Sequence, residues 1–439
     1  MKKKILIALG VIAFIILLLI GISYIKFLKA TKRMEELSRD LEQRITEWEK
    51  KEYKRLPLFG PAITGNAVVF YKEAETMMTT LMKNTDVGID WSDYIERFKP
   101  LTSKALSDYE KAKPIIELVR KGNNAETYKS LLNIRDGFSC KVPNLLSIGY
   151  IAFAMVIQGK ELEKNNQYSD ALQLYCDIIR FGDGYLCNGD SISAMIDFHC
   201  SETGYEEIRR VLLTHKLSED DLNKLISYLK IIFNPEPVYE NVCNTEGLLT
   251  EAELIKYAKM AGFFPQQSGF GSSEPKNFID AIKLQWTNRI GYVNAVEDIR
   301  VAYQEIKRIN NLPYAQAKDE MEDFQGRIKA LSPFSQYLIP NILTGKISYL
   351  QNQAQRRGLY ILCALEIYKA RHQKYPDSLS ELAPSIIAQV PLDPFSDQMF
   401  IYKIDQDQKI LLYSVGENLK DDGGNERNFN DIVIAPLKK

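Results

Sequence analysis

Histidine is scarce in this chain, with three among the 439 residues. Catalysis that depends on an imidazole therefore has few positions to use. His199 stands next to Cys200, but neighbouring residues on a helix point about 100° apart and do not face each other. A Cys–His nucleophile pair would need His215 or His372 to be brought to Cys200 by folding. The alternative is a pair of helical residues near the edge of a core.

Recognisable catalytic motifs are also missing. The sequence contains no H-E-x-x-H zinc motif, no G-x-S-x-G nucleophile turn and no phosphate-binding loop. Paired carboxylates such as Glu251 and Glu253 occur, but a sequence cannot show whether two carboxylates converge across a cleft. These absences favour a non-enzymatic function and leave open an enzyme whose site has no motif.

The chain lacks an excess of charge and lacks any C-x-x-C pair. A formal net charge of −1 gives no bulk attraction to nucleic acid. An even number of cysteines permits disulfides, whose pairing cannot be read from the sequence, and buried free thiols are the alternative. The six are Cys140, Cys176, Cys187, Cys200, Cys243 and Cys363.

One long apolar run is present, from Ile5 to Ile25, and it contains no charged residue. About 20 residues of helix span the core of a bilayer. No small-residue cleavage pattern follows the run, so the sequence predicts an uncleaved anchor (1–25) rather than a signal peptide. Lys2–Lys4 on one side are balanced by the basic residues from Lys26 to Arg33 on the other, so charge alone does not set the orientation.

An amphipathic helix is predicted directly after the anchor, over 26–56. Apolar residues recur there at intervals of three and four: Met34, Leu37, Leu41, Ile45 and Trp48. Such a face either packs on the protein's own domain or forms a short coiled-coil stalk. The prolines within Leu56–Pro61 end the helix.

Helical periodicity dominates residues 57–350 and predicts a large, irregular α-helical domain. Ser218–Asp221 is typical of a capping box at the start of a helix. Asn234–Pro237 predicts the end of that helix, and the loop at 262–275 is a candidate hinge. The segment Asn166–Tyr175 resembles the second half of a tetratricopeptide hairpin, although no array of three repeats is found.

The C-terminal module, residues 351–439, has a mixed α+β pattern. A helix is predicted around Leu359–His372, and Ser378 with Glu381 indicates a second capping box. Two apolar segments, Phe400–Ile404 and Ile410–Ser414, flank a polar five-residue turn and predict a β-hairpin.

The order of motifs in this module resembles the C-terminal half of the major pseudopilin of type II secretion systems. The matching segments are Tyr375–Leu379, Pro391–Phe395, Leu412–Gly416, Gly423–Gly424 and Asn430–Ile432. The chain departs from that family in its first residues, which show no prepilin leader and no glutamate in the apolar helix. We therefore expect the fold of the module, but not assembly into a filament.

An acidic loop lies between Glu417 and Asp431, where nine of fifteen residues carry a side-chain oxygen. Composition alone is typical of a solvated hairpin loop. The resemblance implies a calcium site, because the corresponding pseudopilin loop binds Ca²⁺. By position, its ligands would be Asn418, Asp421 or Asp422, and Asp431. Asn418 replaces an aspartate of the family, which removes one negative charge and should weaken the site.

Taken together, the sequence predicts a mainly α protein with one transmembrane helix and a small pseudopilin-like module. The leading hypothesis is an interaction or scaffold protein in the bacterial inner membrane, with its bulk outside the cytoplasm and a protein partner in a secretion or pilus-like system. The resemblance, rather than the charge, supports that orientation. The alternative is a membrane-tethered hydrolase with its site in the helical domain.

Overall fold

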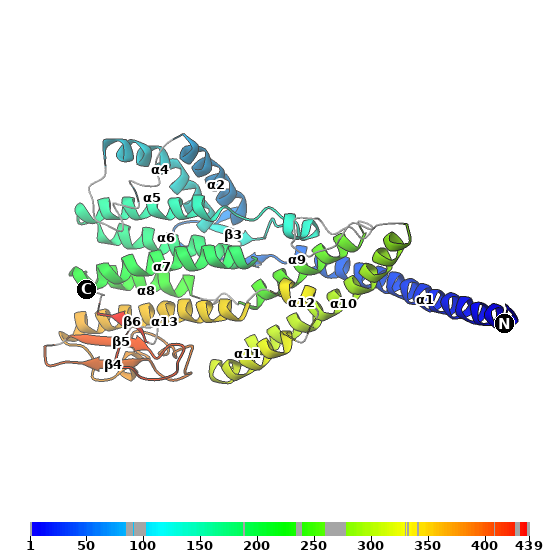
Figure 1. Cartoon of the computed structure of the whole chain (residues 1–439). Helices are drawn as coiled ribbons and strands as arrows, with labels where there is room; N and C mark the ends of the chain where they lie inside the picture. Colours follow the sequence, from blue (N-terminus) through cyan, green and yellow to red (C-terminus); the bar gives the residue numbers. More distant parts are fainter. Residues whose placement is uncertain are drawn as a thin grey trace.

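The chain is mostly helical, as the sequence predicts, and helices make up 70% of it. In the computed structural model (Figure 1), helix α1 projects from a body of stacked helices. The structure describes residues 2–84, 91, 102–187, 189–233, 239–259, 278–329, 331, 333–339, 342–407, 409–425 and 431–436. The expected helix end at Asn234–Pro237 and the expected hinge at 262–275 lie outside these residues.

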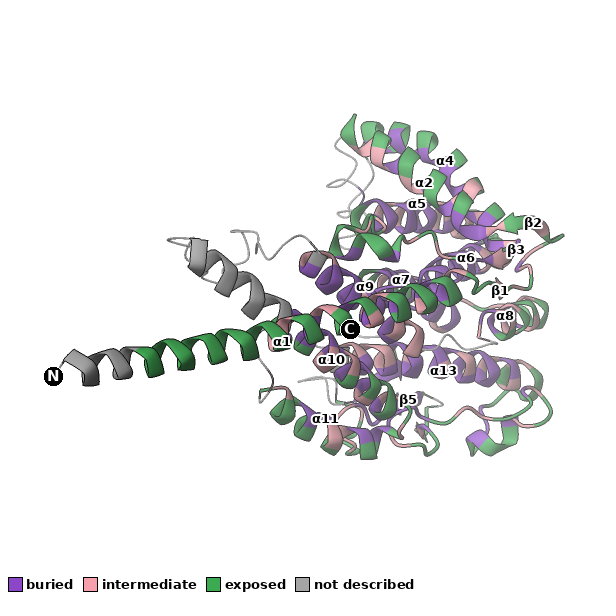
Figure 2. Ribbon diagram, turned by 90° about the vertical axis from the view of Figure 1, so that its right-hand side faces the viewer, coloured by how far each residue is buried: buried purple, intermediate pink, exposed green. Residues whose placement is uncertain are grey.

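Helix α1 (Lys2–Glu49) joins the apolar segment to the body without a break. From Gly10 onward it is long and apolar enough to cross a membrane, and its apolar window is not buried in the protein. Figure 2 shows this part of α1 exposed all round as it leaves the body. In the described residues one other helix passes the same test, α5 (Leu145–Lys164), but half of its window is buried. Helix α1 is therefore the better candidate for a membrane span.

The second half of α1 packs on the body. Its five periodic apolar residues are all buried: Met34, Leu37, Leu41, Ile45 and Trp48. They lie against α9 (Glu240–Lys259) and α10 (Phe278–Asn310). The indole Nε1 of Trp48 donates a hydrogen bond to Thr245 Oγ1 at 3.0 Å. Of the two arrangements left open by the sequence, the structure has the helix packed on its own protein.

The body is a stack of roughly parallel and antiparallel helices (Figure 1). Helix α8 (Glu219–Ile232) starts at the predicted capping box, where Ser218 and Asp221 cap each other's backbone. The predicted tetratricopeptide-like segment forms the start of α6 (Tyr168–Leu186), which packs between α5 and α7 (Ser191–Thr214). The helices of this part are α2 (Ala67–Lys83), α4 (Ser103–Asn123), α5, α6 (Tyr168–Leu186), α7 (Ser191–Thr214) and α8 (Glu219–Ile232).

A three-stranded sheet that the sequence analysis did not predict lies beside these helices. Its strand order is β1-β3-β2, with β1 antiparallel and β2 parallel to β3. The strands are only two to four residues long: β1 (Tyr53–Lys54), β2 (Ile63–Asn66) and β3 (Ala125–Tyr128). A 3₁₀ segment, η1 (Ile134–Ser139), then leads toward α5 and contacts α9.

Beside α1 lies a second apolar core, built from α9, α10, α11 (Tyr314–Ile328) and α12 (Pro333–Leu338). Ile299 and Ile306 of α10 are buried in it, as is Ala317 of α11. Because the apolar face of α1 belongs to the same core, α1 is fixed to the body by packing.

Helix α13 (Ile342–His372) crosses the expected domain boundary at residue 350. Its residue Ile361 shares one core with Ile151 of α5 and Leu412 of the C-terminal sheet. A Cβ on Gly358 would meet Ile434 Cγ1 at 2.4 Å, so glycine allows the sheet to pack closely on α13. The C-terminal module and the helical body therefore share α13.

The C-terminal sheet has the order β4-β5-β6. The predicted hairpin is present, with β4 (Ile401–Ile404) antiparallel to β5 (Ile410–Ser414). The predicted capping box of Ser378 and Glu381 opens the 3₁₀ segment η3 (Leu379–Leu382). A third strand, β6 (Ile432–Ala435), was not predicted and pairs with β5.

Candidate functional site

Asp431 is the most buried of the four predicted calcium ligands, with 2% of its surface exposed. Its Oδ2 accepts hydrogen bonds from the backbone N–H groups of Gly424 at 2.7 Å and Asn425 at 3.1 Å. Gly423 and Gly424 have φ of +77° and +81°, values that favour glycine. Its Oδ1 is buried and has no hydrogen-bond partner among the residues that the structure describes. Because an unpaired buried carboxylate oxygen is costly, this atom is suited to receive a cation.

Asp421 is instead held by the sheet. Its Oδ1 accepts hydrogen bonds from the Tyr413 hydroxyl and from the Gly423 N–H at 2.9 Å, and Lys403 Nζ lies 3.6 Å from its Oδ2. The hydrogen bond from Tyr413, followed by that from Gly423, lowers the pKa of the Asp421 carboxyl. The charged form that a metal needs is therefore favoured, but a cation would have to share this carboxylate with Tyr413.

Asn418 and Asp422 form a separate contact, with Asn418 Nδ2 donating to Asp422 Oδ2 at 2.6 Å. Asn418 Oδ1 accepts a hydrogen bond from the N–H of Lys420 at 2.9 Å. The predicted residues thus enter three sets of hydrogen bonds within one loop. Among the described residues, no group of three or more His, Cys, Asp or Glu side chains is arranged to hold a metal. The loop supplies suitable oxygens, of which the free Oδ1 of Asp431 is the best placed.

Asp393 is a buried residue of the C-terminal module whose role the sequence did not indicate. Its Oδ1 accepts from the Ser414 hydroxyl at 2.8 Å, and its Oδ2 from the Val415 N–H at 3.1 Å. These bonds fasten the Pro391–Phe395 segment to the end of β5. Two of the five segments that carry the pseudopilin resemblance, Pro391–Phe395 and Leu412–Gly416, are therefore joined through one carboxylate.

The three histidines do not assemble with Cys200 into a catalytic pair. The Cys200 thiol is fully buried, and burial raises its pKa. His199 is half-buried, and burial lowers its pKa. The rings of His215 and His372 lie against Tyr168 and Tyr368, at centroid distances of 4.7 and 4.3 Å. This arrangement favours the alternative of helical residues near a core edge, because a reactive thiolate needs a lowered pKa and an accessible site.

A buried ionic cluster crosses the helical core. Arg356 of α13 donates from Nη2 to Asp183 of α6 and from Nε to the Tyr205 hydroxyl at 3.0 Å. Asp197 of α7 lies next to Asp183. Burial is the main cause that raises the pKa of Asp197, and the negative charge of Asp183 raises it further. The side chains of Asp183, Asp197 and Tyr205 are enclosed in the core, and Arg356, although buried, also borders a cavity. The cluster is therefore a structural link between three helices.

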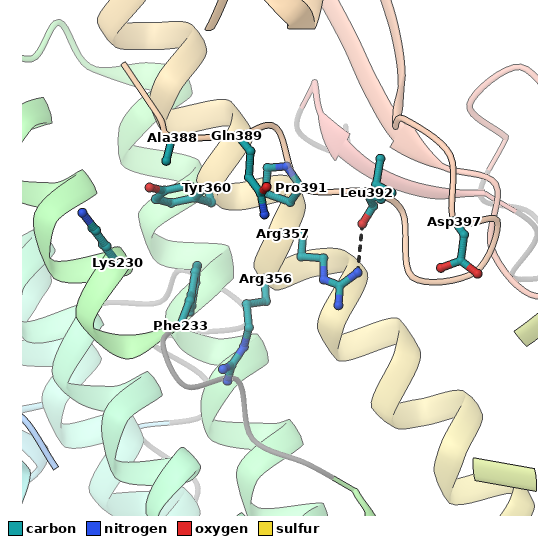
Figure 3. A pocket seen from close by; sticks show the side chains of 10 residues that line it. All are labelled: Lys230, Phe233, Arg356, Arg357, Tyr360, Ala388, Gln389, Pro391, Leu392 and Asp397. Atoms are coloured by element: carbon teal, nitrogen blue, oxygen red, sulfur yellow. Dashed lines mark hydrogen bonds between the residues drawn. The ribbon is translucent and has the colours of Figure 1, made fainter. Parts of the chain in front are cut away.

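Two adjoining cavities lie along α13, with volumes of about 490 Å³ and about 210 Å³. Both have Arg357 and Asp397 in their walls, so we refer to them together as the α13 groove. Figure 3 shows the larger cavity between the end of α8, the middle of α13 and the segment 388–397. Volumes of a few hundred Å³ are typical of binding sites. No sequence motif pointed to this groove, because its walls come from distant segments of the chain.

The lining of the groove is mixed. In the larger cavity Phe233, Tyr360 and Leu392 supply apolar surface, while Lys230 and Arg357 supply positive charge. The smaller cavity is rich in aromatic and polar side chains, among them Tyr239, Asn311, Tyr314 and Tyr349. Aromatic rings with a few polar groups are the composition expected of a recognition surface.

Comparison with protein-family models, with curated proteins and with solved structures found no match to this chain. The pseudopilin resemblance therefore rests on the residues that carry it and remains a prediction.

Proposed function

We propose that this chain is a membrane-anchored interaction protein of the bacterial inner membrane, with its body outside the cytoplasm. The observation that carries the proposal is the continuity of α1, whose first half is exposed and apolar and whose second half is buried against α9 and α10. A body held rigidly at a membrane, with a groove that opens between its elements, suits the capture of a partner. The pseudopilin-like motifs favour a partner in a secretion or pilus-like system.

Calcium binding by the acidic loop is part of this proposal. The Oδ1 of Asp431, which has no partner within the described part of the chain, and the lowered pKa of Asp421 support it. Asn418 and Asp422 would complete the set of oxygens, since calcium takes six to eight of them from carboxylates, amides and carbonyls. The ion would tie the loop to the end of β5 and so stabilise the C-terminal module.

Two measurements test this function. A reporter that works only outside the cytoplasm, fused after Lys439, should be active, and a silent fusion beside an active cytoplasmic reporter would reverse the orientation. Chemical crosslinking in intact membranes should join the chain to a defined partner protein. Purification of the uncrosslinked monomer alone, at native expression level, would contradict the interaction function.

The tethered hydrolase remains the alternative function, and the larger cavity is where its chemistry would take place. Among the described residues that line this cavity, Asp397 is the one carboxylate. A hydrolase that uses paired carboxylates needs a second one. A screen of the full-length chain against peptides, glycans and esters decides between the two functions, since turnover that is abolished by Asp397→Asn would overturn the scaffold proposal.

A further inference from the structure

We propose that the α13 groove binds an extended peptide segment of the partner, with an acidic side chain of that segment placed at the Lys230 end. This inference rests on the proposed interaction function and names the surface and the chemistry that the partner must present. The positions of the two cavities, the charges on their walls and the amide side chains at their rims carry it.

The length of the groove points to a chain rather than to a compact ligand. The larger cavity ends at Arg357 and Asp397, and the smaller cavity begins at the same two residues. A ligand that fills both must pass this junction along α13. An extended peptide does so with alternating side chains directed into successive pockets, which is how strand-like segments are recognised.

The charges in the groove are unevenly distributed. Lys230 is exposed and enters no ion pair within the described residues, whereas Arg356 is neutralised by Asp183. In the smaller cavity, Glu240 is paired with Lys307 at 2.6 Å. Figure 3 shows Lys230 at one side of the larger cavity and Asp397 at the other, with Arg357 between them. Lys346 of the smaller cavity is buried, and its Nζ donates to the backbone carbonyls of Ile309, Asn310 and Leu312. The exposed positive charge therefore lies at the Lys230 end, where an acidic side chain is favoured.

Apolar and amide groups supply the remaining contacts. Phe233 and Tyr360 lie near Lys230, and their rings can cover an apolar side chain next to the acidic one. Gln389 in the larger cavity and Asn311 in the smaller one are exposed amides. An extended peptide has free backbone N–H and C=O groups, and amide side chains can both donate to them and accept from them.

The walls are fixed before any ligand binds. Arg357 Nη1 donates to the carbonyl of Leu392 at 3.0 Å and so ties the segment 388–397 to α13 (Figure 3). On the opposite wall, Arg356 Cζ lies 5.0 Å from the centre of the Phe233 ring. A groove with fixed walls loses less conformational entropy on binding.

Fluorescence anisotropy with the full-length chain in lipid nanodiscs tests this inference. The probes are two labelled pools of ten-residue peptides that alternate apolar and varied positions, one with a fixed glutamate and the other with lysine in its place. We expect the wild type to bind the glutamate pool roughly tenfold more tightly than the lysine pool. The Lys230→Glu variant should reverse this preference, because it inverts the charge at that end of the groove.

Lys224→Glu is the matched control, since Lys224 lies on the same helix, is paired with Asp220 at 2.6 Å and does not line the groove. It should keep the wild-type preference. Binding of neither pool, or an equal effect of the two substitutions, would overturn the inference. If a partner is crosslinked in membranes but Lys230→Glu leaves that partner bound, the groove assignment fails while the interaction function stands.

Discussion

Arg356 of α13 donates a hydrogen bond from its Nη2 to the Oδ1 of Asp183 of α6, and both side chains are buried. This ion pair connects the helix that supports the C-terminal sheet to the middle of the helical body. If one partner of a buried ion pair is removed, the other charge is left in the core without a counter-charge, and the fold is destabilised. The stability of the whole body should therefore depend on this contact.

Arg356→Ala should destabilise the chain by about 3–5 kcal/mol, because it leaves the Asp183 carboxylate buried without its counter-charge. Arg371→Ala is the control on the same helix, since Arg371 pairs with Glu219 at the surface at 2.7 Å and should cost less than about 1 kcal/mol. Urea denaturation of both variants gives the comparison. Equal free energies of unfolding for the two variants would show that the buried pair does not link the helices.

The stability of the fold should fall as the pH rises from about 4 to about 6. Burial raises the pKa of Asp177 to about 6, against the effects of its hydrogen bond from Asn123 and its ion pair with Arg120. The folded state then holds a proton that the unfolded state releases above its own pKa of about 4. This carboxyl therefore stabilises the fold at low pH and loses up to about 3 kcal/mol of that contribution by pH 7.

Asp177→Asn removes this titration. Compared with wild type, the variant should gain stability by roughly 2–3 kcal/mol between pH 4 and pH 7 in urea denaturation. Asp220→Asn, at an exposed position of α8, should follow the wild-type curve. If the free energy of unfolding of Asp177→Asn changed with pH in parallel with that of wild type over this range, the raised pKa would be contradicted.

Calcium should raise the melting temperature of the full-length chain. At about 100 times its Kd, a ligand that binds only the folded state stabilises it by about 2.7 kcal/mol. Asp431→Asn should abolish this response, because it removes the buried carboxylate with the free oxygen. Asp407→Asn in the exposed hairpin turn should keep it. The same melting temperature in millimolar calcium and in chelator would end the calcium hypothesis.

Packing of α1 on the body should contribute measurably to stability. Leu41 is buried in the apolar core that α1 shares with α9 and α10, whereas Leu28 on the same helix is 48% exposed. Leu41→Ala should cost about 2–5 kcal/mol in denaturation of the detergent-solubilised chain. Leu28→Ala should cost little there, since this side chain is exposed and lies outside the buried core. A small effect at Leu41 would indicate that α1 detaches from the body as an independent stalk.

The sequence predicted those elements whose signals are local. The capping boxes at Ser218 and Ser378 are present, and so are the β4–β5 hairpin and the buried face from Met34 to Trp48. Each depends on residues three or four apart, or on a short turn between two apolar segments. Such patterns follow from backbone geometry and need no knowledge of distant contacts.

Elements that depend on distant pairing were missed. Strand β3 pairs with β1 and β2 from far earlier in the chain, and each of these strands is too short to show alternation. Strand β6 was missed because its first residues were interpreted as the end of the acidic loop. In the structure its residue Ile434 packs against Gly358 of α13. Helix α13 begins at Ile342, inside the region predicted to be helical, and runs past the predicted boundary at residue 350 because it packs on both the body and the C-terminal sheet.

The candidate site was predicted only in part. The acidic loop was found by its composition. The sequence could not show that Tyr413 would donate a hydrogen bond to Asp421, or that one oxygen of Asp431 would have no partner among the described residues. The α13 groove was not predicted, since its walls meet only in the folded chain. Segments around 230, 357 and 392 carry no shared pattern that would connect them.

Photocrosslinking in native membranes tests the central claim most directly. A photoreactive amino acid in place of Gln389 lies in the wall of the α13 groove, and one in place of Lys224 serves as the control outside it. We expect a discrete protein adduct from position 389 that is absent from position 224 and is lost in the Lys230→Glu background. No adduct from position 389, or the same adducts from both positions in both backgrounds, would contradict the proposed partner-binding groove.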